Sequence, residues 1–470
     1  MIPCRLPGMP DEPSSWKNRS PGDGTIEFPE TFPGDVGSLA ARSARAFTGW
    51  RSLTLDQRWA ALQGCRRRLQ AGADNLATLI SSETGKPIRE AAMELGAAIA
   101  KFDLAFADAE RFLRDEMVTD GPHPAGIRRR PRGPAAVIAP FNFPIHLGHG
   151  AVLAYLLAGN TVLFKPSPLA ANVGSAYAAE MQAALPEDVF QLVQGWGETG
   201  RSLALHPDVR SVCFTGSLPA GMALARDLAA DYSKSLALEL GGKNSAIICG
   251  DADLDSAAPS VADGMCLTTG QRCNATSRVL VHESIAEEFL ERLRASLARY
   301  EPGDPMDPET TLGPLISAAA RDRYAGLARI PAGNWLVPGA CEESLSGKRG
   351  NYVRPAVVVA GEEIDSTPLA QNETFCPVLV VETFPDETGA VNRHEAWHFG
   401  LTASVFTRDE RTFERIGDRL SVGNLYWNLP TTFSPSTLPF GGWGASGNGR
   451  PGGRGFIRFA AEEQSVQWKS

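Results

Sequence analysis

The chain has 470 residues, of which 43% are hydrophobic and 21% charged, and its formal net charge at pH 7 is −9. That length predicts about two to three domains with large cores, and the composition is that of an ordinary globular protein. An acidic chain lacks the basic surface that nucleic acid requires, and no apolar run approaches the ~20 residues of a membrane span, so the sequence predicts neither a nucleic-acid nor a membrane partner.

The opening MIPCRLPGMPDEPSSW lacks the apolar core of a secretory signal, and the eight cysteines follow neither a disulfide framework nor CxxC spacing. We therefore expect a cytoplasmic protein with reduced thiols. The first ~35 residues, which are rich in Pro, Gly, Ser and Asp, are predicted to form an irregular lead-in.

Helix is expected from Gly37 to about Arg114, interrupted at SETGKP, because apolar residues recur there at helical spacing. The basic segment GIRRRPRG, Gly126–Gly133, is interpreted as a solvated or interface hairpin rather than a phosphate-binding site. Beyond it, β-rich runs alternate with helical stretches in the order AAVIAP, HGAVLAYLLAG, NTVLFK, Ser175–Ala184, FQLVQG, SVCF, MALARDLAADY and LALEL. This alternation of strand and helix predicts a parallel sheet. A second α/β unit is expected to begin near Gly241, before the strand SAIIC.

Cys273 differs from the other cysteines in its surroundings. Those lie mostly in apolar runs such as SVCF and AIIC and are expected to be small buried hydrophobes. Cys273 lies in the turn-like segment TTGQRCNATS, with Arg272 directly before it, and a reachable sulfur beside a cation favours the nucleophilic thiolate. Taken alone, however, the segment still favours an inert thiol.

Two other motifs contain groups that a nucleophile would need. LELGGKN places Glu239 before two glycines in an apolar setting, which would raise its pKa towards the range of a general base. PFNFP holds Asn142 in a rigid turn, from which its amide could donate to an oxyanion. A capping or salt-bridging glutamate and an asparagine that serves only the turn are the alternatives.

Two segments suit a phosphate-bearing cofactor. In FTGSLPAG, Gly216 and Ser217 lie between a strand and a helix and could offer backbone N–H groups to a phosphate. The spacing is not GxGxxG, so a plain turn is an equal alternative. NTVLFKPSP puts Lys165 at the carboxyl end of a strand, where open α/β sheets bind ligands, and a surface lysine is the competing interpretation.

HEAWH, His394–His398, matches the HExxH pattern of zinc proteases. A third ligand should follow, but FGLTASVFTRD offers no His, Asp or Glu before Asp409 and has the pattern of a strand rather than of a continuing helix. We therefore predict no bound metal and keep a zinc peptidase only as a remote alternative.

PFNFP, LAGNTVLFKPS, FTGS, LELGGKN, GQRC, NETFCP and PFGGWGASGNGR occur in this order over nearly the whole chain from about Ala41. Together with the spacing between Glu239 and Cys273, they resemble the aldehyde dehydrogenase superfamily. WNLPTT, GASGNGRP and the GH of HLGHG are most similar to its N-succinylglutamate 5-semialdehyde branch, which serves arginine catabolism. The resemblance implies oxidation of an aldehyde to a carboxylic acid through a thiohemiacetal and a thioester on Cys273, with Asn142 holding the oxyanion and Glu239 activating water.

The resemblance also implies a site for NAD or NADP. Lys165 would contact the adenosine ribose, Gly216 and Ser217 the pyrophosphate, and Glu373 and Phe375 the nicotinamide ribose and ring. Further residues implied at this site are Ile138, Pro140, Phe141, Ser167, Pro168, Gly200, Phe214, Gly221, Leu240 and Gly241.

Two residues depart from the family pattern. Pro168 stands where NAD-preferring relatives have a glutamate for both ribose hydroxyls, so a 2′-phosphate is not repelled there and we expect use of NADP as well as NAD. Cys376 occupies a position that is usually glycine, and nothing in the sequence explains it.

The fold implied by the resemblance is α/β, with a doubly wound cofactor domain formed by residues 1–114 and 132–241 and an α/β catalytic domain formed by residues 242–436. Residues 115–131 and 437–470 would form a small oligomerisation element and C-terminal segment, joining the hairpin around GIRRRPRG to the strand in FIRFAAEEQSVQW. A homodimer or homotetramer follows from the resemblance alone.

The substrate favoured by the resemblance is N-succinylglutamate 5-semialdehyde, and another semialdehyde or a general aliphatic aldehyde is the alternative. Its carboxylates would need donors, which we expect from Thr431, Thr432 and Arg272, unless Arg272 serves only to tune the thiolate. A CoA-acylating dehydrogenase is disfavoured because Glu239 is present in the base position, and a catalytically dead homologue is disfavoured because Cys273 is present as well.

Overall fold

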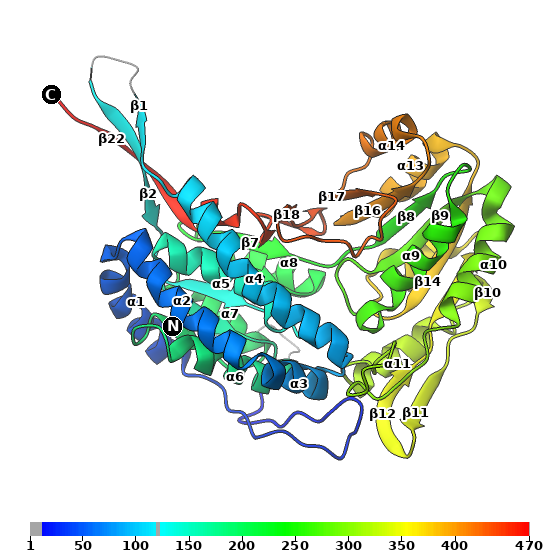
Figure 1. Ribbon diagram of the computed structural model, residues 1–470, viewed down its shortest axis with the longest axis horizontal. Coiled ribbons are helices and arrows are strands. Elements are labelled where there is room, and N and C mark those ends of the chain that lie inside the picture. Colours follow the sequence, from blue (N-terminus) through cyan, green and yellow to red (C-terminus); the bar gives the residue numbers. More distant parts are fainter. Residues whose placement is uncertain (1–11, 119–122, 470) are drawn as a thin grey trace.

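The computed structural model describes residues 12–118 and 123–469. Residues 1–11 of the predicted lead-in with Cys4, residues 119–122 of the predicted hairpin and residue 470 lie outside the described residues. Two mostly parallel sheets with helices on their faces dominate the chain (Figure 1), which confirms the predicted α/β fold. Among the described residues, no helix is both long and apolar enough to cross a bilayer.

The predicted helical region comprises α1 (Val36–Ser52), α2 (Leu55–Ala71), α3 (Ala73–Thr84) and α4 (Ile88–Phe112). The break at SETGKP is confirmed: α3 ends at Gly85, whose φ of 77° is left-handed, and Pro87 precedes α4. A further break precedes α2, where Thr54 and Gln57 form a reciprocal capping box. The helical periodicity of the sequence did not reveal that division.

The first sheet has the order β20-β7-β6-β3-β4-β5. Its strands are β3 (Ala135–Ile138), β4 (Val162–Lys165), β5 (Phe190–Leu192), β6 (Ser211–Thr215), β7 (Ser235–Glu239) and the antiparallel β20 (Gly447–Asn448). The helices along this part of the chain are α5 (His146–Ala158), α6 (Ala171–Gln182), α7 (Gly197–Leu205) and α8 (Leu218–Leu228). β4 and β7 are parallel to the strands between them, so Lys165 and Glu239 end up at one edge of the sheet.

The second sheet has the order β10-β13-β14-β9-β8-β16-β17. Its strands are β8 (Asn244–Ile248), β9 (Thr276–His282), β10 (Gly333–Val337), β13 (Ala356–Ala360), β14 (Val378–Phe384), β16 (Thr402–Phe406) and β17 (Asn424–Trp427). The helices in this half are α9 (Leu254–Cys266), α10 (Ala286–Leu297), α11 (Ala318–Leu327), α12 (Pro368–Gln371), α13 (Glu387–Glu395) and α14 (Glu410–Gly417). Cys273 lies in the loop that connects α9 to β9.

A three-stranded sheet extends away from the two large sheets (Figure 1) and consists of β1 (Glu116–Val118), β2 (Ala125–Pro131) and β22 (Ala461–Gln467). It joins the basic hairpin to the C-terminal strand, as the sequence predicted. Arg129 and Arg130 lie opposite Glu463 and Glu462 in the β2–β22 register, and Arg129 forms an ion pair with Glu463 at 3.1 Å. The neighbouring strand therefore supplies carboxylates to the basic segment, which supports the hairpin interpretation.

The segment after residue 436 is more widely connected than the predicted domain division implies. Besides β22, it contributes β20 to the first sheet, both strands of the pair β18–β21, and β19, which pairs with the earlier β15. These short strands are β15 (Phe399–Gly400), β18 (Pro439–Phe440), β19 (Trp443–Gly444) and β21 (Gly452–Gly453), and a separate hairpin is formed by β11 (Cys341–Leu345) and β12 (Lys348–Val353). The domain boundaries themselves stay a prediction.

Candidate active site

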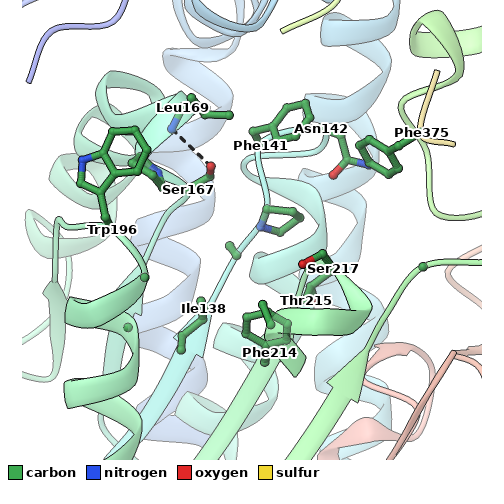
Figure 2. Close-up of a pocket in the computed structure, with 18 of the residues that line it drawn as sticks. Ile138, Phe141, Asn142, Ser167, Leu169, Trp196, Phe214, Thr215, Ser217 and Phe375 are labelled. Atoms are coloured by element: carbon green, nitrogen blue, oxygen red, sulfur yellow. Dashed lines mark hydrogen bonds between the residues drawn. The ribbon is translucent and has the colours of Figure 1, made fainter. Parts of the chain in front are cut away.

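A cavity of ≈ 660 Å³ is lined by residues from both halves of the chain. The predicted site residues that line it are Ile138, Pro140, Phe141, Asn142, Lys165, Ser167, Pro168, Gly200, Phe214, Gly216, Ser217, Glu239, Gly241, Cys273, Glu373 and Phe375. Figure 2 shows Phe141, Asn142 and Phe375 around one end of this cavity, with Ser167, Leu169 and Trp196 on another side. The structure thus brings the predicted nucleophile, base and oxyanion donor into one space with the predicted cofactor residues.

Gly221 and Leu240 do not line the cavity but pack beneath it. A Cβ on Gly221 would lie 2.4 Å from Leu240 Cδ2, so the absence of a side chain lets α8 approach β7 closely. Their effect on the site is to set the position of α8, whose N-terminal end borders the cavity at Gly216 and Ser217.

The loop before Cys273 has an unusual backbone. Thr268 and Thr269 have φ values of 53° and 56°, and Gly270 follows at 69°. The left-handed region is unfavourable for threonine, so neighbouring contacts must hold it. The Thr268 N–H and hydroxyl donate to Glu90 at 3.1 and 2.6 Å, and the Thr269 hydroxyl donates to the carbonyl of Gly313 at 2.8 Å.

Cys273 is half-buried in this loop and lines the same cavity as Glu239. Burial raises the pKa of Glu239 to about 7, as its apolar setting predicts, and the Cys273 thiol opposes that rise. Burial, followed by the charge of Glu239, raises the pKa of Cys273 well above its usual value. The resting sulfur is therefore a thiol, and Glu239 is a carboxyl that can change protonation near neutral pH.

Arg272 does not have the expected effect on this thiol. Its guanidinium donates to Glu90 Oε2 at 2.8 Å and to Thr268 Oγ1 at 2.9 Å, and it lies over the ring of Phe143 at 5.0 Å. The expectation that a neighbouring cation would favour the thiolate is wrong for the resting enzyme, because the raised pKa of Cys273 keeps it protonated. Arg272 is also absent from the residues that line the cavity.

Thr431 and Thr432 are not brought to the cavity either. The Thr431 hydroxyl is fully buried and makes hydrogen bonds with Thr276 Oγ1 at 2.7 Å and with the carbonyl of Asn274 at 2.8 Å. Thr432 is 9% exposed. The contacts of Thr431 therefore position the loop after Cys273 and do not present a donor to the space around the sulfur.

Lys165 and Glu373, which are predicted to bind the cofactor, both have pKa values shifted by burial. Lys165 is buried, and burial lowers its pKa to about 8 while the charge of Glu12 opposes this effect. Burial raises the pKa of Glu373 to about 8, and the Gly242 N–H donates to its Oε1 at 3.3 Å. A Cβ on Gly241 would lie 2.2 Å from Glu373 Oε2, so that glycine leaves room for the carboxyl.

Two contributors to this region escaped sequence interpretation. Asn244 donates to the carbonyl oxygens of Cys273 and Ala275 at 2.8 and 2.9 Å, and its position in GGKN directly before a strand was the available signal. Glu12 accepts hydrogen bonds from the N–H and hydroxyl of Thr199 at 2.8 and 2.6 Å, and nothing in the irregular lead-in indicated this.

Cys376 is buried, and burial raises the pKa of its thiol to about 12, opposed by the charges of Arg323 and Lys243. Its carbonyl and peptide lie against Gly270, where a Cβ would meet the Cys376 carbonyl carbon at 2.5 Å. These contacts concern the backbone, and nothing in the structure explains why the side chain is a cysteine.

The HEAWH segment does not form the zinc-protease arrangement. Helix α13 ends at Glu395, so His394 and His398 do not share a helix face. His394 is buried, and burial lowers the pKa of its imidazole to about 4. Within residues 12–118 and 123–469, no group of three or more His, Cys, Asp or Glu could hold a metal ion.

Comparison with known proteins identifies aldehyde dehydrogenases as relatives of this chain. The sequence model of the aldehyde dehydrogenase family matches residues 11–466. An N-succinylglutamate 5-semialdehyde dehydrogenase of Klebsiella pneumoniae subsp. pneumoniae is 36% identical over 425 residues, covering 89% of this chain and 85% of that protein. Betaine aldehyde dehydrogenase 1 of Rhizobium meliloti is 34% identical over 424 residues, covering 89% and 86%.

Among solved structures, an NAD-dependent aldehyde dehydrogenase from Sinorhizobium meliloti superimposes with a TM-score of 0.90 at 29% identity, covering 97% of this chain and 91% of that one. The family match spans nearly all of the chain, and the relatives are matched over most of their own length. The chain therefore belongs to the aldehyde dehydrogenase family.

Proposed function

We propose that this aldehyde dehydrogenase oxidises N-succinylglutamate 5-semialdehyde to N-succinylglutamate, a step of arginine catabolism, with NAD or NADP as hydride acceptor. The observation that carries the chemistry is that Cys273 and Glu239 meet in the cavity that Lys165 and Glu373 also line. The substrate assignment rests on the similarity to N-succinylglutamate 5-semialdehyde dehydrogenases at about 35% identity and on a buried charged cluster that contains Arg272.

In the proposed mechanism, the Cys273 sulfur adds to the aldehyde carbon and gives a thiohemiacetal. The thiol proton passes to solvent in this step, so Glu239 stays ionised for the hydrolysis that follows. The new oxyanion is held by the Asn142 amide and the Cys273 backbone N–H. After hydride loss the thioester is hydrolysed by a water that Glu239 deprotonates, which frees the acid and the sulfur.

The residues present fit a dinucleotide. The N-terminus of α8 faces the cavity at Ser217, whose side chain makes no capping hydrogen bond, so the first N–H groups of this helix are available to a pyrophosphate. A Cβ on Gly216 would lie 2.7 Å from the Phe214 ring, so a side chain at this position would require the ring to move. Lys165 and Glu373 offer a cation and a carboxyl to the two riboses, and the bound nicotinamide would accept the hydride.

The buried charged cluster that contains Arg272, the chain neighbour of Cys273, favours an acidic substrate. Lys86, Glu90, Glu94, Lys101 and Arg272 form a largely buried cluster in which Lys86 pairs with Glu94 and Arg272 with Glu90. Burial lowers the pKa of Lys101 to about 8, opposed by the charge of Glu94, so this lysine still carries charge at neutral pH; it lines a separate cavity with Gly150 and Arg454. The cluster therefore has an excess of positive charge, which attracts a carboxylate and opposes a cationic aldehyde such as betaine aldehyde.

A homodimer or homotetramer in the cytoplasm is part of the proposal. Met117 on β1 and Trp468 just after β22 are 63% and 39% exposed, which places large apolar side chains on the projecting three-stranded sheet. Exposed apolar side chains on such an extension favour contact with another subunit.

The function is tested by initial rates with each dinucleotide over a panel that contains the acidic semialdehyde, betaine aldehyde and neutral aliphatic aldehydes. The highest kcat/KM is expected for the acidic semialdehyde. A higher kcat/KM for betaine aldehyde would replace the substrate assignment and leave the aldehyde dehydrogenase chemistry in place.

A further inference from the structure

The lead-in reaches the cavity at the residue where the family pattern is broken. Trp16 Nε1 and Asn18 Nδ2 both donate to the carbonyl oxygen of Pro168, at 3.1 and 2.9 Å. The ring of Trp16 also packs edge-on against Trp196, with centroids 5.9 Å apart, and Trp196 and Pro168 both line the cavity. The N-terminal segment is thus tied to the wall of the cofactor cavity.

Glu12 places a carboxylate behind that wall, on Thr199, which stands between the cavity-lining residues Glu198 and Gly200. Its two oxygens accept from the N–H and the hydroxyl of Thr199, in the first turn of α7, at 2.8 and 2.6 Å. Trp196 precedes this helix without a side-chain cap of its own, so Glu12 supplies the cap from a distant part of the chain. A carboxylate at this end of a helix is favoured by the helix dipole and occupies donors that a phosphate would otherwise use.

The charge of this carboxylate also acts on the ammonium group of Lys165. The side chain of Lys165 runs along α7, since a Cβ on Gly200 would lie 3.3 Å from its Cδ and Cε atoms. The negative charge of Glu12 acts on the Lys165 ammonium against the effect of burial. Lys165 and the N-terminal turn of α7 are therefore parts of one charged region at the cavity, and Glu12 belongs to it.

We propose that Glu12 is a specificity-determining residue of the cofactor site, which supplies from the lead-in the carboxylate missing at position 168 and so favours NAD over NADP. This inference rests on the proposed placement of the adenosine ribose beside Lys165. The charge of this carboxylate repels a 2′-phosphate from behind the cavity wall, and its bonds to Thr199 keep those donors from that phosphate. The expectation of ready NADP use, drawn from Pro168 alone, is revised accordingly.

The test uses adenosine 5′-monophosphate and adenosine 2′,5′-bisphosphate as probes, with dissociation constants measured by calorimetry on the full-length chain. Wild type should bind the bisphosphate more weakly than the monophosphate. In Glu12→Gln, whose amide can still accept from Thr199, the ratio of the two dissociation constants should shift by tenfold or more towards the bisphosphate. Glu12→Asp keeps the charge and should retain most of the wild-type ratio.

Glu27→Gln is the matched control, because Glu27 is another lead-in carboxylate whose partner is the exposed Arg19. It should leave the ratio unchanged. A Glu12→Gln ratio equal to that of wild type, or equal weakening of both probes with a lowered Tm, would reduce Glu12 to a helix cap and overturn the proposal. Because neither probe undergoes chemistry, this result is independent of whether the semialdehyde is the substrate.

Discussion

The side-chain amide of Asn244 donates to the carbonyl oxygen of Cys273 at 2.8 Å, which ties the loop of the nucleophile to the first strand of the second sheet. The same amide donates to Ala275, and its oxygen accepts from the Thr402 N–H at 3.1 Å on the neighbouring strand. One buried side chain thus connects the loop to two strands. The position of the sulfur depends on this connection, because the preceding loop has a strained left-handed backbone.

We predict that Asn244→Ala lowers kcat by about tenfold to a hundredfold with little change in dinucleotide affinity, since a misplaced nucleophile loses its alignment with the aldehyde. Steady-state kinetics and dinucleotide titration measure the two effects. Asn424→Ala is the control, because Asn424 also donates to two backbone carbonyls, those of Leu401 and Gly441, elsewhere in this half of the chain. Equal losses of kcat in both variants would show a general loss of stability instead.

Cys273→Ala should abolish aldehyde oxidation, with kcat reduced by more than ~10⁴-fold, because the covalent route needs the sulfur. Dinucleotide binding should be nearly unchanged, since the sulfur contributes little to cofactor affinity. Cys341→Ala removes an exposed thiol and should behave as wild type. Turnover near the wild-type rate in Cys273→Ala would eliminate the thioester mechanism.

Glu239→Gln should still form the acyl-enzyme but hydrolyse it slowly. The expected loss in steady-state turnover is about 10²–10⁴-fold, the usual contribution of a general base. A pre-steady-state burst of reduced cofactor followed by a slow phase is the diagnostic measurement. Equal slowing of both phases would mean that Glu239 acts mainly in forming the acyl-enzyme, by accepting the thiol proton.

Turnover limited by hydrolysis of the acyl-enzyme should depend on pH through Glu239. Only the ionised carboxylate can accept a proton, and burial raises its pKa to about 7. The rate should therefore fall about tenfold per pH unit below pH 7 and level off above it. Burial also raises the pKa of Glu373, to about 8, so Glu373→Gln is the comparison that must keep this profile. A profile lost in Glu373→Gln and kept in Glu239→Gln would reverse the assignment.

The sequence predicted the parts of the site that depend on local order along the chain. Lys165 follows from a strand end, because parallel strands bring their carboxyl ends to one edge of a sheet, and Glu239 follows from its apolar setting before two glycines. It could not predict Glu12 or Glu90, whose partners Thr199 and Thr268 are far away in sequence. Such pairs are decided by tertiary packing, and no local pattern records them.

The error over Arg272 has the same origin. The sequence shows a cation beside Cys273 but cannot show that Glu90, on α4, pairs with it at 2.8 Å. Because Arg272 precedes Cys273 in the chain, its charge was expected to lie near the sulfur. The guanidinium instead extends towards α4 and the ring of Phe143. Thr431 was also a plausible donor by composition, but its hydroxyl is used within the fold.

The pairing of Arg272 leaves the excess charge of the cluster on Lys101, and this sets the expected substrate preference. Because the Lys101 ammonium is buried and donates to the carbonyl of His146 at 2.9 Å, its charge is weakly screened by solvent. We predict that kcat/KM for N-succinylglutamate 5-semialdehyde exceeds that for hexanal by about tenfold to a hundredfold, in line with the ~1–3 kcal/mol of attraction between opposite unit charges about 6–15 Å apart in a protein.

Lys101→Met, which keeps most of the side-chain volume, should reduce that preference at least severalfold while leaving kcat/KM for hexanal nearly unchanged. Arg66→Met is the control, because Arg66 is an arginine of the same helical region whose partner, Asp103, is 60% exposed. Raising the salt concentration should not abolish the wild-type preference, since a buried charge is screened much less than a surface one. Equal kcat/KM for hexanal and the acidic semialdehyde in wild type would remove the substrate assignment and leave the family assignment unaffected.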